Sequence, residues 1–335
     1  MGYPMKVVKV NMSLENKDYP IFSYVSQIKD KRRNIDWLWK PYIPKGKITL
    51  LTGDPGEGKT LIAMDIASRL TRGEPILGDE SVEEPVTIVY QSAEDDLYDT
   101  LIPRLNAAGA DLDRIVFIKD EESTLTLEDE RISYTIRKTH AGLLVIDPLQ
   151  AYLPDGGMLQ SAGRMRDILG RVAGLAAREN CAVLIIGHLT KRSTDRDLYR
   201  SLGSIDIAAL ARSVLKLERD PRDENNRILV QIKNSLAKCA KPIRCHILEG
   251  PVIEWIGYYE EEEKTFSGVS QNDKRSRCMD LLNEILQEGP ASSSEIYRLM
   301  SVLDISPRTA NQAKSDAGIR SRKRNRTWEW YLPEE

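Results

Sequence analysis

Short apolar runs alternate with longer amphipathic stretches along most of the chain from residue 48 onward. The apolar runs are nearly continuous, which is typical of strands whose two faces are both covered by helices. Repeated alternation of strands and helices favours a mostly parallel sheet. We therefore expect an α/β fold, with strands at 48–52, 86–91, 143–146, 182–187, 213–217 and 228–233 and helices near 59–70, 95–108, 129–138 and 161–178.

The pattern changes at both ends of this alternating region. Residues 1–35 are polar and weakly patterned, which indicates an N-terminal arm. An acidic run containing Glu260–Glu263 indicates a linker over residues 260–273. We therefore expect one α/β domain over residues 36–259 and a second, smaller domain over residues 274–335.

The smaller domain reads as three helices and a hairpin. The first helical pattern covers Lys274–Gln287, and Ser292–Glu295 is a plausible cap for the second helix. The third is expected over Pro307–Ala317, with proline at its first position. Ile319–Leu332 alternates enough to form a short hairpin. This order of elements resembles a winged helix-turn-helix domain.

Side chains of the expected hairpin divide into an apolar and a basic set. We expect Trp328, Trp330 and Leu332 to face inward, and Arg322–Arg326 to lie at the tip. The net charge of the whole chain is −3, yet Ser306–Thr327 contains seven Lys and Arg residues against one Asp. A strongly basic segment in an otherwise acidic protein favours nucleic-acid binding.

DNA contacts are therefore expected from the smaller domain, on duplex DNA. The alternative is a protein-docking domain whose basic face is merely solvated. The candidate DNA-binding residues here are Arg308, Lys314, Arg322, Lys323, Arg324 and Arg326.

Composition narrows the class of protein. Hydrophobic residues make up 41% and charged residues 30% of the 335 residues, as in a globular protein. We expect no membrane span, because no apolar run approaches the length of about 18 residues that one needs. The N-terminus lacks the apolar core of a signal peptide, so a cytoplasmic location is expected. Cys239, Cys245 and His246 match no standard zinc spacing, and we do not favour a metal site there.

Aromatic residues precede the first strand of the expected sheet. Trp37, Trp39 and Tyr42 could stack on a base or on a neighbouring protomer. Aromatic residues that enter a sheet are more often part of its core, and we favour the core.

Residues 53–60 form an uninterrupted G-x-x-x-x-G-K-[ST] motif between a strand and a helix. In this context the motif predicts a phosphate-binding loop, whose backbone N–H groups surround the phosphates of a nucleoside triphosphate. Lys59 would neutralise phosphate charge, and the Thr60 hydroxyl would hold Mg²⁺. The alternative is an ordinary glycine-rich turn before a helix. The expected nucleotide-binding residues are Gly53, Asp54, Pro55, Gly56, Glu57, Gly58, Lys59, Thr60 and Leu61.

Two carboxylates follow later strands of the expected sheet. Glu94 comes after the strand at 86–91, which we expect to neighbour the strand before the loop, and it could polarise an attacking water. It could instead favour the N-terminus of the next helix, together with Asp95. Asp147 follows four apolar residues, as does the Walker B aspartate that orients Mg²⁺. The next residue is Pro148 rather than an acid, which strengthens Glu94 as the candidate base.

His188 ends another apolar strand and could sense the γ-phosphate, although such a histidine is often only a core residue. The loop that follows, residues 189–202, contains Lys191 and Arg192, which we expect to contact DNA. The guanine-specifying N-K-x-D pattern is absent, so ATP is the expected nucleotide.

These motifs occur together in one order: G-D-P-G-x-G-K-T, S-A-E-D, the Walker B aspartate, G-H-x-x-K, and A-R-S-V-L. The set resembles the RecA-like ATPases of the plasmid RepA helicase group, over residues 36–250. The resemblance implies that Glu94 is the catalytic carboxylate and His188 the sensor. It also implies that Arg212 is an arginine finger that reaches a neighbouring subunit, with Lys233 as a second such charge.

The expectation is therefore a RecA-like P-loop NTPase with a C-terminal winged helix-turn-helix domain, using ATP and Mg²⁺. Its function would be that of a DNA helicase or translocase of a plasmid, phage or other mobile element. We expect it to form a homo-oligomer, specifically a hexamer, and to act on single-stranded DNA. The alternative is an ATP-switched DNA-binding regulator, helicase loader or recombination factor that does not unwind DNA. A third is a nucleotide-sensing signalling or defence protein whose C-terminal domain binds protein.

Overall fold

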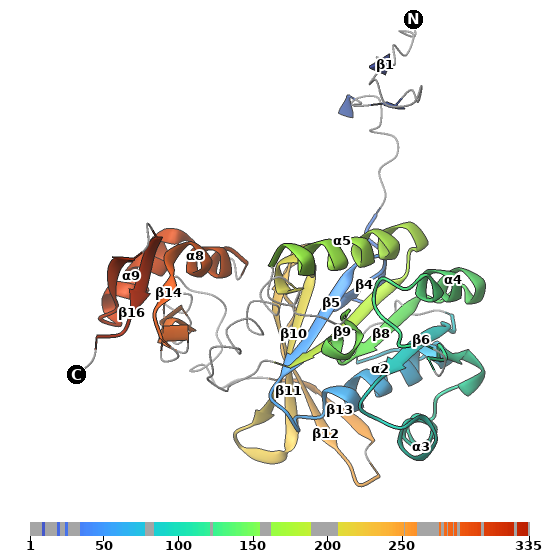
Figure 1. Cartoon of the computed structure of the whole chain (residues 1–335). Coiled ribbons are helices and arrows are strands. Elements are labelled where there is room, and N and C mark those ends of the chain that lie inside the picture. The colour runs from blue at the N-terminus through green and yellow to red at the C-terminus, as the bar shows by residue number, and fades with distance from the viewer. Residues whose placement is uncertain are drawn as a thin grey trace, which may run out of the picture. The chain divides into compact units, whose positions relative to one another are not determined.

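The structure is a computed structural model of the 335-residue chain (Figure 1). It describes residues 9–10, 19–20, 24–25, 34–77, 84–120, 123–154, 162–188, 207–250, 252–259, 275, 278–279, 281–283, 285–286, 289–302, 305–324 and 327–333. Residues 1–36 form one unit and residues 37–335 another. In the first unit, β1 (Lys9–Val10) pairs with β2 (Tyr19–Pro20) in antiparallel fashion.

A nine-stranded sheet in the order β13-β12-β11-β10-β5-β9-β8-β6-β7 organises the second unit. The strands from β10 to β7 in this order are mutually parallel, as the apolar runs predict. They are β5 (Ile48–Gly53), β6 (Ile88–Ser92), β7 (Ile115–Val116), β8 (Leu143–Asp147), β9 (Ala182–His188) and β10 (Ser213–Asp220).

Three antiparallel strands extend the sheet beyond β10. They are β11 (Asp223–Asn234), β12 (Ile243–Ile247) and β13 (Ile253–Tyr258). The strand expected at 228–233 is part of β11. The sequence pattern did not reveal β7, β12 or β13, because β7 is only two residues long and the other two are half-exposed.

Helices cover both faces of the parallel part of the sheet (Figure 1). Core residues from α2 (Lys59–Arg72) and α3 (Ile102–Ala107) share one apolar cluster with one face of the strands. Core residues from α4 (Glu130–Thr139) and α5 (Ala162–Glu179) share a second cluster with the other face. Burial on both faces explains why these strands read as continuous apolar runs. The chain therefore has an α/β fold consistent with a RecA-like P-loop NTPase.

Two of the three aromatic residues before β5, Trp39 and Tyr42, lie in the core, as we favoured, whereas Trp37 is half-buried. They belong to β3 (Trp37–Trp39), which pairs with β4 (Ile43–Pro44), and to the turn between these strands. Trp39 and Tyr42 are fully buried and stack with ring centroids 4.2 Å apart. Trp255 contacts Trp39 edge-on at 5.4 Å.

Residues near the C-terminus form a small three-stranded sheet with helices packed on it. Its order is β14 (Ala291–Ser292), β16 (Thr327–Tyr331) and β15 (Arg320–Arg324). The helices are α8 (Ser293–Val302) and α9 (Pro307–Asp316), and the described residues between Arg275 and Leu286 are also helical. The expected third helix and hairpin are thus present. Ser306 caps α9 by accepting the Thr309 N–H at 3.1 Å.

The expectation that Trp328 faces inward is wrong. Trp330 is buried in the core of this small sheet and meets Tyr297 edge-on at 5.3 Å. Trp328 lies one pleat nearer the turn of the hairpin, opposite Lys323, and is 54% exposed. The alternation places both rings on one face, but the apolar core packs only around Trp330.

Within the described part of the chain, no helix combines the length and the apolar character that a membrane crossing requires.

Candidate nucleotide-binding site

The G-x-x-x-x-G-K-T motif forms the loop between β5 and α2, at the carboxyl end of β5. Gly56 and Gly58 have φ angles of 79° and 89°, in the left-handed region that favours glycine. Gly53 is required for another reason: a Cβ atom there would lie 2.4 Å from the carbonyl oxygen of Leu217. All nine residues expected to bind nucleotide, 53–61, belong to this loop or to the first turn of α2.

Lys59 is buried and bonded to its own loop. Its Nζ donates to the carbonyl oxygens of Gly53 at 2.9 Å and Asp54 at 2.8 Å. Burial lowers the pKa of the ammonium group, and the nearby carboxylates, Asp147 first among them, act in the opposite sense. Asp147 lies close enough to stabilise this charge, so the two residues belong to one site.

Asp147, at the end of β8, lies at the centre of a small polar cluster. Its side chain accepts a hydrogen bond from Thr60, while its Oδ2 atom is buried without any hydrogen-bond partner. Burial, opposed by the Thr60 hydrogen bond and reinforced by Glu94 and Asp95, raises the pKa of Asp147 to about 6. A hydroxyl beside a carboxylate with an unsatisfied oxygen is a donor set that suits Mg²⁺, a cation that prefers oxygen ligands. Thr60 and Asp147 therefore fit the predicted metal site.

Glu94 lies beside this cluster, but the strand that carries it does not have the expected neighbour in the sheet. β6 does not neighbour β5, because β9 and β8 lie between them. Glu94 reaches the site through β8: the Ala93 N–H donates to the Asp147 carbonyl oxygen at 3.0 Å. The Glu94 charge then acts on both Lys59 and Asp147.

The helix that follows Glu94 is capped by another residue. Asp96 accepts the N–H groups of Tyr98 at 2.7 Å and Asp99 at 3.0 Å, and Asp95 is paired with Arg104 at 2.9 Å. Asp96 therefore supplies the cap of this helix, and the Glu94 side chain is exposed beside the site.

The backbone of His188 lies directly opposite Gly53, since β9 and β5 are parallel neighbours in that register. This places the end of β9 beside the start of the phosphate loop, as the prediction of a sensor requires. The loop at 189–202, with Lys191 and Arg192, lies outside the described residues.

Comparison with known proteins agrees with this geometry. The family model AAA_25, described as an AAA domain, matches residues 18–194, slightly more than half of the chain. The chain belongs to this AAA domain family. The matched segment contains the phosphate loop, Glu94, Asp147 and His188.

Individual relatives share about a quarter of their aligned residues with this chain. The DNA repair protein RadA of Streptococcus pneumoniae is 25% identical over 191 residues, which are 56% of this chain and 39% of that protein. RadA of Halalkalibacterium halodurans is 25% identical over 195 residues, covering 57% and 37% of the two chains. RadA of Aquifex aeolicus is 24% identical over 153 residues, covering 45% and 30%. The chain thus spans well under half the length of these relatives.

Arg212 and Lys233 lie far from the phosphate loop of their own chain. The Arg212 N–H donates to the carbonyl oxygen of Ile48, the first residue of β5, at 2.9 Å. The phosphate loop begins at the other end of β5, five residues on, or about 16 Å away at 3.3 Å per residue. Arg212 is exposed at the amino-terminal ends of the parallel strands, whereas the phosphate loop lies at their carboxyl ends. A role of Arg212 in catalysis would have to be played at another subunit's site.

Lys233 is held within its own chain. Its Nζ donates to the carbonyl oxygens of Ala208 at 2.7 Å and Ala209 at 3.2 Å. Burial, followed by the charge of Arg212, lowers the pKa of Lys233. The ammonium group is thus already hydrogen-bonded to the segment that precedes Arg212.

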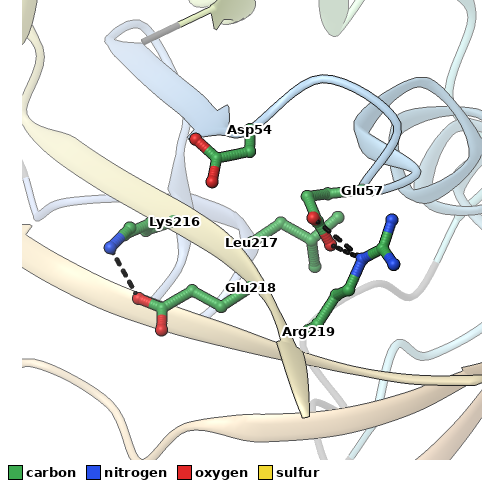
Figure 2. Close-up of a pocket in the computed structure, with 6 residues that line it drawn as sticks. All are labelled: Asp54, Glu57, Lys216, Leu217, Glu218 and Arg219. Atoms are coloured by element: carbon green, nitrogen blue, oxygen red, sulfur yellow. Dashed lines mark hydrogen bonds and ion pairs between the residues drawn. The ribbon is translucent and has the colours of Figure 1, made fainter. Parts of the chain in front are cut away.

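One side chain of the phosphate loop is buried against the neighbouring strands β10 and β11. Glu57 is buried and pairs with Arg219 of β10 and Arg227 of β11. A cavity of about 380 Å³ opens on this side of the loop, lined by Asp54, Glu57, Lys216, Leu217, Glu218 and Arg219 (Figure 2). Sequence reasoning missed both arginines, because no motif surrounds them. The sequence shows only that an acid, Glu57, stands at a variable position of the loop motif, and this does not identify its partners.

Cys239, Cys245 and His246 do not come together. Cys239 is exposed, Cys245 is buried in β12 with its pKa raised to about 12 by burial, and His246 Nδ1 lies 2.7 Å from Asn226 Oδ1. No cluster of three metal-binding side chains occurs among the residues that the structure describes.

Most of the basic residues expected to bind DNA in the C-terminal segment are on its surface. Arg308, Arg322, Lys323 and Arg324 are exposed, and Arg326 lies outside the described residues. Lys314 is less free: its Nζ lies 3.0 Å from Ser321 Oγ and 4.8 Å from the centroid of the Trp330 ring. β15 is an edge strand on which every side chain is exposed, and four of its five residues are basic.

Proposed function

We propose that this chain is an ATPase that acts on DNA as a motor, with its active sites completed at the interfaces of a homo-oligomer. A hexameric helicase or translocase of a plasmid, phage or other mobile element, working in the cytoplasm, is the specific form we propose. The observation that carries the ATPase is the contact of Thr60 with Asp147, beside Lys59 and Glu94.

The same residues suggest how MgATP would be held. The N–H groups of the loop and the N-terminus of α2 would bind the phosphates, and Lys59 would exchange its two carbonyl partners for phosphate oxygens. Mg²⁺ held by Thr60 and Asp147 would withdraw charge from the phosphate oxygens. Glu94 would accept a proton from the attacking water, since it is exposed beside the cluster and electrostatically coupled to it.

The position of Arg212 supports hydrolysis between subunits. An arginine that stabilises transition-state charge raises the rate by about 10³–10⁵ when it is supplied by a neighbour. Arg212 lies at the amino-terminal ends of the parallel strands, and the phosphate loop lies at their carboxyl ends. One protomer therefore cannot supply both the arginine and the loop to a single site. An assembly in which the amino-terminal ends of the strands face the next protomer's loop would bring Arg212 to that loop.

DNA is proposed as the partner on two grounds. The curated relatives are named as DNA repair proteins. The C-terminal segment exposes a basic edge strand next to α9, which carries Arg308. We propose that residues 274–335 form a winged-helix domain, joined by a linker at 260–273 to the ATPase domain at 36–259, and that it binds duplex DNA through phosphate contacts.

Single-stranded DNA is proposed for the loop that follows β9. His188 adjoins Gly53 in the sheet, so loss of the γ-phosphate could shift the start of residues 189–202. Lys191 and Arg192 in that loop would then change their contact with the DNA backbone. This would convert hydrolysis into movement along a strand.

Steady-state ATP hydrolysis at several protein concentrations, with and without single-stranded DNA, tests the proposal. A motor built in this way gains specific activity with concentration and again with DNA. Slow hydrolysis with tight binding to one duplex sequence would instead favour the ATP-switched regulator, loader or recombination factor. Hydrolysis that is independent of concentration and of DNA would contradict the proposal.

A further inference from the structure

Glu57 occupies a variable position of the phosphate-loop motif, yet its side chain is only 9% exposed. The neighbouring Pro55 and Gly56 are exposed, so the loop presents its backbone outward and buries this one acid. An ionised carboxylate removed from water has to be paired and hydrogen-bonded. Its partners therefore decide whether the loop can keep this conformation.

Two arginines from neighbouring strands supply that pairing. Arg219 Nε lies 3.1 Å and 3.3 Å from the two carboxylate oxygens of Glu57 (Figure 2). Arg227 Nε donates to the Glu57 carbonyl oxygen at 2.9 Å and lies 3.3 Å from Oε2. Arg219 and Arg227 are opposite each other in the β10–β11 ladder, so side chain and backbone of one loop residue are bound to one hairpin.

The hairpin holds one of these arginines, Arg227, in a buried and hydrogen-bonded position. Arg227 is buried and also donates to the carbonyl oxygens of Glu224 at 2.5 Å and Asn226 at 2.9 Å. β10 touches the loop a second time, where Gly53 leaves no room for a Cβ atom beside the Leu217 carbonyl. A movement of the loop would therefore have to move the hairpin as well.

The other end of the same hairpin carries the two cations discussed above. Arg212 immediately precedes β10, and Lys233 of β11 is paired with Val214. The seven residue steps from Arg212 to Arg219 span about 23 Å of extended chain, from one end of the strand to the other. One continuous element thus joins the phosphate loop to Lys233 and to Arg212, the residue proposed to act on a neighbouring site.

We propose that Glu57 is a positioning residue that couples the nucleotide state of its own phosphate loop to the placement of Arg212 and Lys233. The proposal rests on the proposed function, because it takes the loop to bind ATP. Binding of the triphosphate shifts the loop, the Glu57 carboxylate and carbonyl pull on Arg219 and Arg227, and the β10–β11 hairpin carries the shift to its far end. The charge of Glu57 stays neutralised throughout, so it does not repel the phosphates.

Three variants separate coupling from simple stability. Glu57→Gln removes the charge but keeps the shape, and Arg219→Gln removes the more exposed partner. Glu218→Gln is the matched control, since Glu218 lines the same cavity but pairs with Lys216 at 2.9 Å and not with the loop. Circular dichroism and thermal melting identify the folded variants. Should Glu57→Gln fail to fold, Arg219→Gln decides.

The readouts are titration with a fluorescent ADP analogue and amide hydrogen exchange with and without a saturating non-hydrolysable ATP analogue. Light scattering keeps the comparison at equal oligomeric mass. We expect Glu57→Gln and Arg219→Gln to bind nucleotide about tenfold more weakly, a usual size for coupling between linked parts. At saturation, the change in exchange over residues 207–216, clear in the wild type and in Glu218→Gln, should be lost in both.

Two results would count against these ideas, and they are distinguishable. A saturated Glu57→Gln protein that shows the wild-type change over residues 207–216 would overturn the coupling and leave Glu57 as a local brace. A wild-type protein that does not bind the ADP analogue would overturn the proposed function itself, before any variant is compared.

Discussion

Thr60 donates a hydrogen bond to the carboxylate of Asp147, although β6, α3, β7 and α4 lie between the two residues in the chain. The bond joins the first turn of α2 to the end of β8. It leaves Asp147 Oδ2 buried without a partner. An unpartnered buried oxygen is costly, and a cation bound at this position would satisfy it.

The first prediction concerns Asp147→Asn. Because burial raises the pKa of Asp147 from 3.8 to about 6, its contribution to stability is present below pH 4 and is lost as the pH rises through 6. Removing the charge should stabilise the nucleotide-free protein at pH 8 by about 1–3 kcal/mol, the range implied by about two pKa units. Urea unfolding at pH 4 and pH 8 measures this. A variant less stable than wild type at pH 8 would contradict it.

A second prediction follows for Mg²⁺. A metal ion needs the ionised carboxylate, so the affinity for Mg²⁺ in the presence of ADP should rise between pH 5 and pH 7 in the wild type. In Asp147→Asn this rise should be absent and hydrolysis abolished. Calorimetric titration with MgCl₂ at several pH values is the measurement. An equal pH dependence in both proteins would show that another group controls the metal.

The third prediction concerns Arg212→Ala. Its side chain is exposed at the edge of the sheet away from the phosphate loop, so the variant should bind nucleotide with wild-type affinity. Hydrolysis should fall by a factor of about 10³ if the guanidinium acts on a neighbouring site.

Mixing provides the control for this third prediction. Small amounts of Arg212→Ala or Lys59→Ala protein should inhibit wild-type ATP hydrolysis. The loss of activity should be larger than the fraction of variant protein in the mixture. Activity that falls only in proportion, or survives in Arg212→Ala alone, would exclude the arginine-finger role.

The fourth prediction concerns the basic edge strand. Arg322 and Arg324 are exposed in β15, one pleat apart and on one face. Arg322→Ala/Arg324→Ala should weaken duplex DNA binding and reduce the salt slope by about 2, because two phosphate contacts are lost. The charge-matched control is Arg137→Ala/Lys138→Ala on the exposed surface of α4. Fluorescence anisotropy from 50 to 200 mM salt separates the two (about the range over which such contacts are screened). Equal losses would indicate a non-specific charge effect.

The fifth prediction compares two tryptophans of the same strand. Trp330 is 3% exposed, so Trp330→Ala should destabilise the C-terminal segment by about 3–5 kcal/mol. Trp328 is 54% exposed, and Trp328→Ala should change stability little. Denaturant unfolding followed by circular dichroism tests both. Comparable destabilisation by both variants would contradict the assignment of Trp328 to the surface. If Trp328 stacks on DNA, Trp328→Ala should also weaken DNA binding while the protein stays folded.

Much of the fold followed from local patterns. Continuous apolar runs marked the parallel strands that helices cover on both faces, and Ser306 with Pro307 marked the start of α9. The half-exposed strands β12 and β13 left no comparable signal. Trp328 was misplaced because alternation reports the face of a strand but not how far the core extends along it.

By itself, the sequence determined the phosphate loop, its strand and helix, and the acid at the end of β8, because each depends on residues adjacent in the chain. Only the tertiary structure decided which strands are neighbours. That order brings Glu94 to the site through β8, sets Arg212 at the far edge of the sheet, and gives Glu57 its two arginines. Pairing across a sheet joins residues far apart in the chain, and their contacts depend on long-range packing that no local pattern records.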